Sequence, residues 1–567
     1  MEPKDLAHQI CGGYITDRRG AVDHVIWGKV HGMNRARDFK GLSTCTCHFD
    51  WLNHTVDEWR FLRQIEAFFK KNASFVQPDV CEEAARRSFD ENEQMCTSTN
   101  LRLKQYLSGT KQGLDLVTHA QVASMERYIR AVLGDLTPFI NSLPELIKVT
   151  PGATAQSSRR NSLPQLKLKA RLYCTTRARA YVHGLFRYYG FDFGRTKTTS
   201  TNRIELVPKN WKTHRTIACE PEGNLPLQLA FDTYVKRRLK KFGIDLSNQS
   251  ANKRKAKHAS IHNNYVTVDF SSASDTISYN TVAMLLPPQW FSFLDDVRSP
   301  EYRGVFGEGT YAKFSSMGNG CTFTLETLLF AAACHAVGAR NFLVYGDDVI
   351  IAKKYYSAYK ALTAFLGFSI NEDKSFAEGP FRESCGGDYF NGIDVTPVYI
   401  RDMTDRKASL CHLVNTLGKL MFPGGKLEAL LTDIIRDYKL PVVPYQESTM
   451  SGIWIDPSLA RTLGVLRTRH GISHFKAYTP RCKWRRFPDS RGFYLWFILK
   501  KATLSYGGPW DGQSRTSVTQ TSSVPLFDHA YVRKRVHWHM PVEAMPDHVL
   551  LWSDIIPALH KGRDYVA

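Results

Sequence analysis

Residues 342–352 read Phe342-Leu343-Val344-Tyr345-Gly346-Asp347-Asp348-Val349-Ile350-Ile351-Ala352, which is two apolar runs with an acidic break between them. Glycine and aspartate both suit a tight turn, so the stretch predicts a β-hairpin with two carboxylates at its tip. An acidic turn is also a common surface feature. Taken alone, the hairpin indicates chemistry only weakly, and other carboxylates must be found before a site can be predicted.

A third carboxylate follows another strand-like run. Tyr265-Val266-Thr267-Val268 is rich in β-branched residues and ends on Asp269. Residues 324–337 are apolar on most faces and predict a buried helix, so the expected class is α+β. Two or three aspartates delivered to one point from separate segments are what a magnesium site for nucleotidyl transfer needs, because Mg²⁺ prefers a few hard oxygen ligands.

Composition limits the possible partners and compartments. The chain has 567 residues, which predicts several lobes, and 75 basic against 54 acidic residues give a net charge of +21. Such an excess favours a polyanionic partner, above all nucleic acid. The N-terminus lacks a secretory pattern, no apolar run reaches the ~20 residues of a membrane span, and the cysteines form no CxxC pair. We therefore expect a soluble, reduced, intracellular protein without a membrane partner.

Five segments carry a resemblance to a known family. In order, the chain reads VDFSSASDTIS (268–278), SSMGNGCTFTLET (315–327), VYGDDVI (344–350), FSINEDKSF (368–376) and GPFRESCGGDYFNGIDVTPVYIR (379–401). These resemble motifs A to E of viral RNA polymerases, in the same order. The sequence is closer still to the replicase β-subunit of the single-stranded RNA bacteriophages, the leviviruses. Two upstream segments also resemble this family: LVPKNWKTHRTIACEP (206–221) and FGIDLSNQS (242–250). The resemblance is dense from Val207 to Arg401.

The resemblance implies a role for each matching residue. The implied metal ligands are Asp269, Asp347 and Asp348, with Asp348 the least secure because neighbouring turn carboxylates can diverge. Lys374 matches a position that serves either as general acid for pyrophosphate or as an electrostatic partner. The implied nucleotide-binding residues are Lys209, Lys212 and Arg215 for the triphosphate, Asp275 and Asn319 for the ribose 2′-hydroxyl, and Ser316 and Gly318 beside them. Asn319 could instead be a turn residue between two glycines.

The family further implies a right-hand polymerase fold with palm, fingers and thumb. We expect an N-terminal, mainly helical region contributing to the fingers (1–195), a basic fingers segment over the nucleotide (196–259), the palm (260–400), and the thumb with the C-terminal region (401–567). Two basic stretches predict RNA tracks by composition, a belt between Lys236 and Lys257 and a basic and aromatic cluster between Arg467 and Arg486. A solvated surface is the alternative for both.

The expected activity is template-directed RNA synthesis from ribonucleoside triphosphates on viral single-stranded RNA, with two Mg²⁺ ions for which Mn²⁺ can substitute. Resemblance alone implies host elongation factors Tu and Ts and a large small-subunit ribosomal protein as partners, in the cytoplasm of a bacterial host. A reverse transcriptase is the nearest alternative, but the family pattern there places a bulky aromatic where this chain has Ser272, Ala273 and Ser274. The second alternative is a non-catalytic basic protein that binds RNA or acts in assembly.

Overall fold

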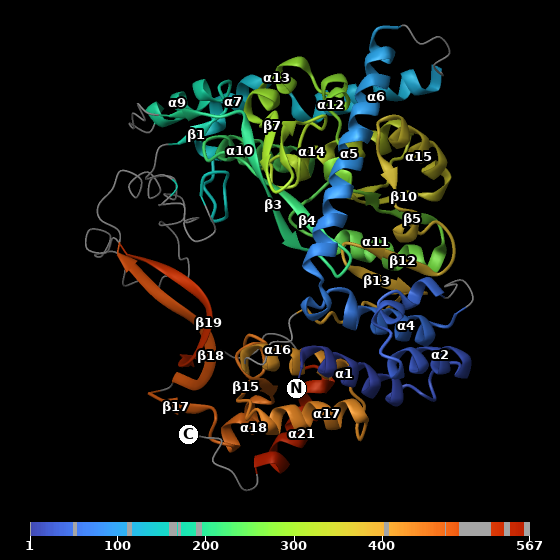
Figure 1. The fold of residues 1–567 in the computed structure, drawn as a ribbon, viewed down its shortest axis with the longest axis vertical. Helices are drawn as coiled ribbons and strands as arrows, with labels where there is room; N and C mark the ends of the chain where they lie inside the picture. The colour runs from blue at the N-terminus through green and yellow to red at the C-terminus, as the bar shows by residue number, and fades with distance from the viewer. Residues whose placement is uncertain are drawn as a thin grey trace.

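The structure is a computed structural model that describes residues 2–48, 54–109, 116–157, 167, 172–188, 196–401, 407–470, 472–486, 523–537 and 545–560. Helices and short strands alternate through it, which confirms the predicted α+β class (Figure 1). The predicted catalytic hairpin, the strand before Asp269 and the buried helix are all present. Their bounds differ from the predicted ones by a few residues at most.

The N-terminal part is helical, as predicted. Its helices are α1 (Pro3–Asp17), α2 (His24–Arg35), α3 (Phe39–Leu42), α4 (Val56–Lys70), α5 (Pro78–Leu107), α6 (Leu116–Leu133) and α7 (Leu136–Leu146). Helix α4 begins with a capping box in which Thr55 and Glu58 satisfy each other's backbone N–H groups. Trp59, Leu62 and Ile65 of this helix are buried, so its apolar stripe is core rather than a ligand site.

The middle of the chain supplies most of the strands. Its first elements are β1 (Tyr173–Cys174), α9 (Arg179–Tyr188), β2 (Lys197–Thr198), β3 (Thr201–Pro208), β4 (His214–Cys219), α10 (Asn224–Lys241), α11 (Ser250–His262), β5 (Tyr265–Val268), β6 (Phe270–Ser271), α12 (Tyr279–Leu285) and α13 (Pro288–Val297). They are followed by β7 (Glu301–Gly304), β8 (Gly307–Thr310), α14 (Thr322–Ala336), β9 (Leu343–Tyr345), β10 (Asp348–Ala352), α15 (Tyr356–Phe365), β11 (Ser369–Ile370), β12 (Phe381–Ser384), β13 (Gly387–Phe390) and β14 (Ile393–Asp394). Strands β5, β10 and β9 form one antiparallel sheet in that order.

The C-terminal part is mixed. Its elements are α16 (Lys407–Leu417), α17 (Lys426–Asp437), β15 (Val442–Pro444), β16 (Ile453–Ile455), α18 (Pro457–Thr462), β17 (Arg467–Arg469), β18 (Ile472–Arg486), β19 (Ser523–His537) and α21 (Asp547–His560). Strands β18 and β19 pair over most of their length as a long antiparallel hairpin that extends away from the helices of this part (Figure 1).

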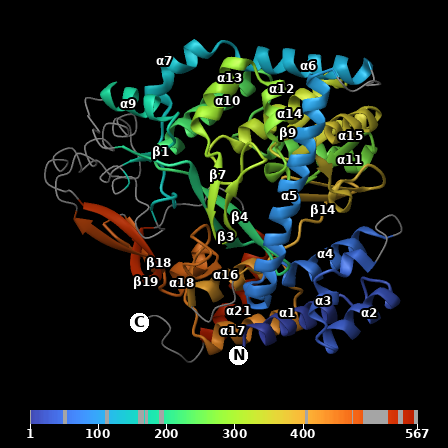
Figure 2. The same cartoon turned by 45° about the horizontal axis from the view of Figure 1, so that its top comes forward.

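Two hydrophobic cores divide the chain, and they do not follow its order. The first core runs from Leu103 to Phe368 and contains the central sheet. The second core joins α1 to α4 with residues from Phe376 onward, including those of α16 and α17. Figures 1 and 2 both place α1 beside α17, at the opposite end of the molecule from α6. The predicted unit 1–195 is therefore shared between two cores, since its first helices pack with the C-terminal part.

Helix α14 packs against the central sheet. All but three residues of α14 are buried, and the helix lies within the first core. Phe330 of this helix stacks on Phe270, with ring centroids 4.2 Å apart. Because Phe270 follows Asp269 directly, this packing fixes the backbone that carries the predicted catalytic carboxylate. The strand ends that bear the acids are thus set by core packing rather than by loops.

Candidate active site

The predicted acidic hairpin is confirmed, with one refinement. Tyr345 of β9 pairs with Asp348 of β10, so only Gly346 and Asp347 form the turn. Gly346 has φ +63°, a left-handed conformation that favours glycine, and a Cβ there would lie 2.7 Å from the Phe323 ring. Asp347 therefore occupies the tip alone, and Asp348 is the first residue of a strand.

Asp269 joins these two residues through the strand register. Val268 of β5 pairs with Val349 of β10, so the next residue on each strand, Asp269 and Asp348, reaches the same end of the sheet. Two segments, the end of β5 and the β9–β10 hairpin, thus bring carboxylates to the same end of the sheet. The spacing of the motifs along the chain could not give this register, which depends on strand pairing.

The side chain of Asp269 is held by the segment after β11. Its Oδ2 accepts hydrogen bonds from Lys374 Nζ and from Asn371 Nδ2, each at 3.2 Å. Burial raises the pKa of Asp269, Lys374 opposes that rise, and Asp347 adds to it. Burial lowers the pKa of Lys374, but the carboxylates of Asp269 and Glu383 outweigh burial and raise it. Lys374 is therefore a cation in contact with the acidic centre.

Asp348 is oriented differently from Asp269. Its Oδ1 accepts hydrogen bonds from the backbone N–H of Cys385, in the turn after β12, at 3.0 Å and from Oγ of Ser384, the last residue of β12, at 3.4 Å. Burial raises the pKa of Asp348 to about 7, against the effect of the Cys385 hydrogen bond. One oxygen of this carboxylate is thus occupied by hydrogen bonds within the protein.

A fourth carboxylate, Glu326, was missed. It lies on α14, is 5% exposed, and its Oε1 has no hydrogen-bond partner among the described residues. Burial raises the pKa of Glu326 well above its ordinary value, and Asp347, Asp275 and Asp269 raise it further. The sequence did contain a signal, namely a charged residue inside an otherwise apolar helix. Burying a charge is costly, so such a residue predicts a functional group.

The carboxylates fit a divalent cation by their chemistry. No three His, Cys, Asp or Glu side chains of the described residues are arranged closely enough to form a metal site. The donors are hard oxygens, however, and Asp347 raises the pKa of both Asp269 and Asp348 through like-charge repulsion. A divalent cation held by Asp269 and Asp347 would relieve this repulsion, and Mg²⁺ takes such ligands. The residues present therefore fit the expected metal.

Asp275 is held by a buried lysine that the sequence analysis also missed. Lys313 is 1% exposed and donates from Nζ to Asp275 Oδ1 at 2.9 Å. It also lies 3.4 Å from Glu93 Oε1 of α5. Burial lowers the pKa of Lys313, but Asp275 and Glu93 outweigh burial and raise it. Glu93 precedes Lys313 by more than 200 residues, so no local pattern could have indicated this triad.

The loop before α14 packs against protein at both of its glycines. Gly318 has φ +110°, and a Cβ there would collide with the carbonyl oxygen of Ala218 in β4. Asn319 is buried, and its Oδ1 accepts from the backbone N–H of Cys321 at 3.0 Å, at the start of α14. The backbone carbonyl of Ser316, also buried, accepts from Asn319 N–H at 3.0 Å. The side-chain oxygen of Asn319 is thus a local cap, which is the turn alternative left open by the sequence.

The three predicted triphosphate-binding residues lie on one hairpin. Lys209 and Lys212 are in the loop between β3 and β4, and Arg215 is in β4. All three side chains are exposed, and none forms an ion pair with a carboxylate in the part of the chain that the structure describes. Although the Lys209 side chain is exposed as a whole, its ammonium is partly surrounded by protein. This burial, together with the charges of Arg215 and Lys374, lowers the pKa of Lys209.

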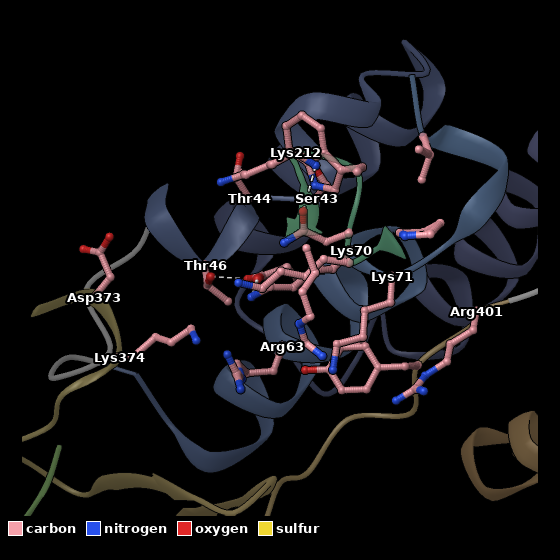
Figure 3. A pocket seen from close by; sticks show the side chains of 18 of the residues that line it. Ser43, Thr44, Thr46, Arg63, Lys70, Lys71, Lys212, Asp373, Lys374 and Arg401 are labelled. Carbon is pink, nitrogen blue, oxygen red and sulfur yellow. Dashed lines mark hydrogen bonds and ion pairs between the residues drawn. The ribbon is translucent and has the colours of Figure 1, made fainter. Parts of the chain in front are cut away.

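These cations line a cavity of about 760 Å³ beside the acidic centre (Figure 3). Eight cationic side chains contribute to its wall, namely Arg63, Lys70, Lys71, Lys209, Lys212, Arg215, Lys374 and Arg401. Three acidic ones contribute, namely Glu66, Asp373 and Glu383. Two of the three acids are engaged by wall cations, since Glu66 pairs with Lys70 at 2.5 Å and Glu383 lies 3.4 Å from Arg63. The cavity is therefore strongly positive.

The N-terminal helices form one wall of this cavity, which the sequence did not predict. Arg63, Lys70 and Lys71 come from α4 and its C-terminal end, and Figure 3 shows them opposite Lys374. Arg63 forms a buried pair with Asp388 and stays charged. Lys71 lies over the Tyr399 ring, 3.8 Å from its centroid. Residues from the first 75 positions thus reach the surroundings of the predicted centre.

Comparison with known proteins defines the class first. The chain is 36% identical over 476 residues to the RNA-directed RNA polymerase subunit beta of Qbeta virus (strain MX1), covering 80% of this chain and 78% of that one. It is 40% identical over 222 residues to the RNA-directed RNA polymerase beta chain of Escherichia phage MS2, covering 38% and 41%. Both relatives are RNA-directed RNA polymerases of RNA phages.

The family described as RNA replicase, beta-chain, matches residues 33–444. The chain therefore belongs to the RNA replicase beta-chain family and is an RNA-directed RNA polymerase of the RNA-phage type. This confirms the family predicted from the motifs. It excludes the two alternative functions, a non-catalytic assembly protein and a reverse transcriptase.

Solved structures with some likeness are also viral RNA-dependent RNA polymerases. The polymerase of BmCPV at its elongation state gives a TM-score of 0.37 at 10% identity, covering 57% of this chain and 33% of that one. An insertion-loop deletion mutant of a human picorbirnavirus polymerase gives 0.31 at 13% identity, covering 61% and 83%. The chain spans about a third of the BmCPV polymerase. Within the described ranges, no helix combines the length and apolar character needed to cross a membrane.

Proposed function

We propose that the chain adds ribonucleotides to the 3′-hydroxyl of a growing RNA on a viral single-stranded RNA template, through a centre with two divalent cations. One observation carries the proposal: Lys374 contacts Asp269 at 3.2 Å and also lines the cationic cavity. The acidic centre and the positive cavity are therefore adjacent parts of one site. A polyphosphate and its metal ions need this combination of charges.

Asp269 and Asp347 would hold the cations, with Asp348 contributing its second oxygen. The bound ions, Mg²⁺ with Mn²⁺ able to substitute, supply charge stabilisation for the attacking hydroxyl and the leaving pyrophosphate. Glu326 lies beneath them as a buried acid whose repulsion by Asp347 a cation would offset. The work of these residues is to fix the positions of the ligands, since phosphoryl transfer is governed mainly by placement and electrostatics.

Lys209, Lys212 and Arg215 would bind the triphosphate. Their freedom from ion pairs with carboxylates among the described residues supports this role, because an anion can meet them without displacing an existing partner. Arginine can in addition bind phosphate oxygens in bidentate fashion. Lys374 would stabilise the negative charge that develops on the leaving pyrophosphate. Its contact with Asp269 favours an electrostatic role, and a general-acid role remains the competing proposal.

Asp275 would receive the ribose 2′-hydroxyl together with Asn319, whose side-chain nitrogen is the group left for this contact. Lys313 is then a positioning residue, because it fixes Asp275 Oδ1 at 2.9 Å and leaves the second oxygen for the substrate. Ser316 and Gly318 would act through the shape of their loop. In the wider assembly, we propose palm, fingers and thumb as predicted, except that helices α1 to α4 pack with the C-terminal part. We propose host elongation factors and a ribosomal protein as partners, and action in the cytoplasm of the infected bacterium.

The test is incorporation of labelled nucleotides on a single-stranded RNA template with Mg²⁺. We expect ribonucleotides to be strongly preferred over deoxyribonucleotides. Asp347→Asn should lower kcat by at least roughly 1,000-fold, since metal-bound charge stabilisation contributes several kcal/mol. Asp90→Asn, which removes an exposed carboxylate of α5, is the matched control and should retain activity. Unchanged activity in Asp347→Asn, or a preference for deoxyribonucleotides, would contradict the proposal.

A further inference from the structure

The C-terminal hairpin carries an excess of positive charge that the proposed catalytic site does not use. By sequence, its strands contain ten Lys and Arg residues, two in β17, five in β18 and three in β19, against the single acid Asp528. The side chains of residues 480–486 and 523–531 lie outside the described part. Figures 1 and 2 both place this hairpin on the opposite side of the molecule from α15.

One face of the hairpin is packed, and the opposite face is exposed at Lys476, Arg533 and Arg535. Phe475 and Ala477 of β18 are buried in the second hydrophobic core. Because side chains alternate along a strand, Lys476 faces the other way and is exposed. Tyr478 exchanges two backbone-anchored hydrogen bonds with Ser451, each at 3.0 Å. The outward face is therefore fixed in position by the fold rather than carried on a loose arm.

Like charges oppose each other on the outward face. Lys476 pairs in register with Arg535, and Tyr478 pairs with Arg533 two residues along. Like charges directly opposite each other destabilise a sheet. Neither Lys476 nor Arg535 forms an ion pair with any carboxylate that the structure describes, so no described residue relieves the repulsion. An arrangement of this kind is stabilised when an external anion binds.

A small cavity marks where that anion would bind. It has a volume of about 80 Å³, and Arg467, Lys476, Arg533 and Arg535 contribute to its lining together with apolar residues such as Val442 and Val465. Arg467 donates from Nε to the carbonyl of Gly464 at 3.0 Å, which fixes the direction of its guanidinium. Cations beside apolar residues attract anions more strongly than cations in open water do, because the local dielectric constant is lower.

We propose that the outward face of β17–β19 is a second RNA-binding site, which holds phosphodiester groups of single-stranded RNA away from the catalytic centre. Residues two apart on a strand are roughly 7 Å apart, so Arg533 and Arg535 are spaced like successive phosphates of an extended strand. RNA is favoured over an acidic protein segment as the occupant because the chain belongs to an RNA replicase family. The inference rests on the proposed function in that the RNA is template or product, but binding here needs no catalysis.

The test is binding of a fluorescein-labelled single-stranded RNA of about 30 nucleotides, followed by fluorescence anisotropy at several NaCl concentrations. Lys476→Gln combined with Arg535→Gln should weaken binding on the order of tenfold and reduce the slope of log K against log salt by about 1.4, because each phosphate contact in a single strand contributes about 0.7. The matched control is Lys104→Gln combined with Arg130→Gln, exposed residues of α5 and α6. If both double variants bind RNA equally, the proposal is overturned and a protein partner becomes the better occupant.

A second measurement uses the unaltered chain, in case the hairpin variant does not fold. RNA containing 4-thiouridine is crosslinked to the protein, and the crosslinked peptides are identified by mass spectrometry. Crosslinks at residues 467–478 or 532–537 support the proposal, and crosslinks confined to other segments overturn it. Neither measurement requires nucleotide incorporation, so a failure here is distinguishable from a failure of the polymerase assay with Asp347→Asn.

Discussion

The acidic end of the β5–β10–β9 sheet and the positive cavity beside it each crowd charges of one sign, but they do so in different surroundings. The acids stand on strand ends and on the buried helix α14, where burial raises the pKa of Asp269, Asp348 and Glu326. Several of the cations stand on exposed loops, as Lys209 and Lys212 do. Repulsion is therefore strong among the acids and largely screened by water among those cations.

This difference explains how the two regions are neutralised. Two of the acids are provided with cations by the fold itself, Asp269 with Lys374 and Asp275 with Lys313. The exposed cations on the β3–β4 hairpin have no carboxylate partner among the described residues. We infer that the acidic end of the sheet must be rigid, because its carboxylates repel one another at short range. The exposed cations of the cavity, by contrast, are available to bind an anion.

The largest effect should come from removing the buried counter-charge of Asp275. Lys313→Met leaves Asp275 and Glu93 without their cation in an interior where Lys313 itself is 1% exposed. Breaking a buried ion pair from one side costs about 3–5 kcal/mol. We expect a loss of that size in the free energy of unfolding, measured by urea denaturation, and a weaker preference for ribonucleotides over 2′-deoxyribonucleotides.

Lys313→Arg is the control for this change, because it keeps the charge within the same space. It should recover part of the stability and most of the sugar preference. A Lys313→Met protein that is destabilised but discriminates between the two sugars as well as the unaltered chain would contradict the positioning role and leave Lys313 with a structural role only.

A somewhat smaller effect is expected where the two regions meet. Lys374→Met removes the cation that contacts Asp269 and lines the cavity. We expect kcat to fall by roughly 100-fold, or about 3 kcal/mol of transition-state stabilisation. Lys374→Arg decides between the two proposed roles, because a guanidinium keeps the positive charge but does not release a proton. Activity within roughly tenfold of the unaltered chain supports the electrostatic role, and a loss as large as that of Lys374→Met supports the general acid.

The sequence predicted those parts of the site that lie within a few residues of one another. The hairpin at Gly346 and Asp347 followed from turn chemistry, and the strand before Asp269 followed from β-branched residues, so both were found. The triphosphate-binding role of Lys209, Lys212 and Arg215 came from resemblance and stays a prediction. Their placement on one hairpin beside Lys374 is what the structure adds.

The parts that the sequence missed depend on contacts between distant segments. Lys313 is an ordinary lysine in the sequence, and it becomes a buried cation only because α5 brings Glu93 to it. The N-terminal helices were assigned to a single region with residues up to 195, yet α4 packs with the C-terminal part and supplies Arg63 to the cavity. Local periodicity correctly gave α4 its buried stripe but carried no information on its partner.

The smallest effect tests a buried group whose burial outweighs the nearby carboxylate of Asp547. His548 of α21 is 8% exposed, its Nε2 lacks a hydrogen-bond partner among the described residues, and burial lowers its pKa to about 4. In the unfolded chain its pKa is about 6.5. As pH falls below 6.5, the unfolded chain binds this proton and the folded chain does not until about pH 4. Stability from this group is therefore present above pH 6.5 and is lost between pH 6.5 and 4.

We expect this loss to reach about 2 kcal/mol between pH 7 and pH 5, from 1.36 kcal/mol per pKa unit. His548→Phe removes the titrating group while filling the same space, so its free energy of unfolding should fall less over that interval, as measured by urea denaturation at both values. An identical pH dependence in the two proteins would mean that His548 finds a counter-charge when protonated. It would then resemble Lys313 and Lys374, whose carboxylate partners keep them charged, instead of contrasting with them.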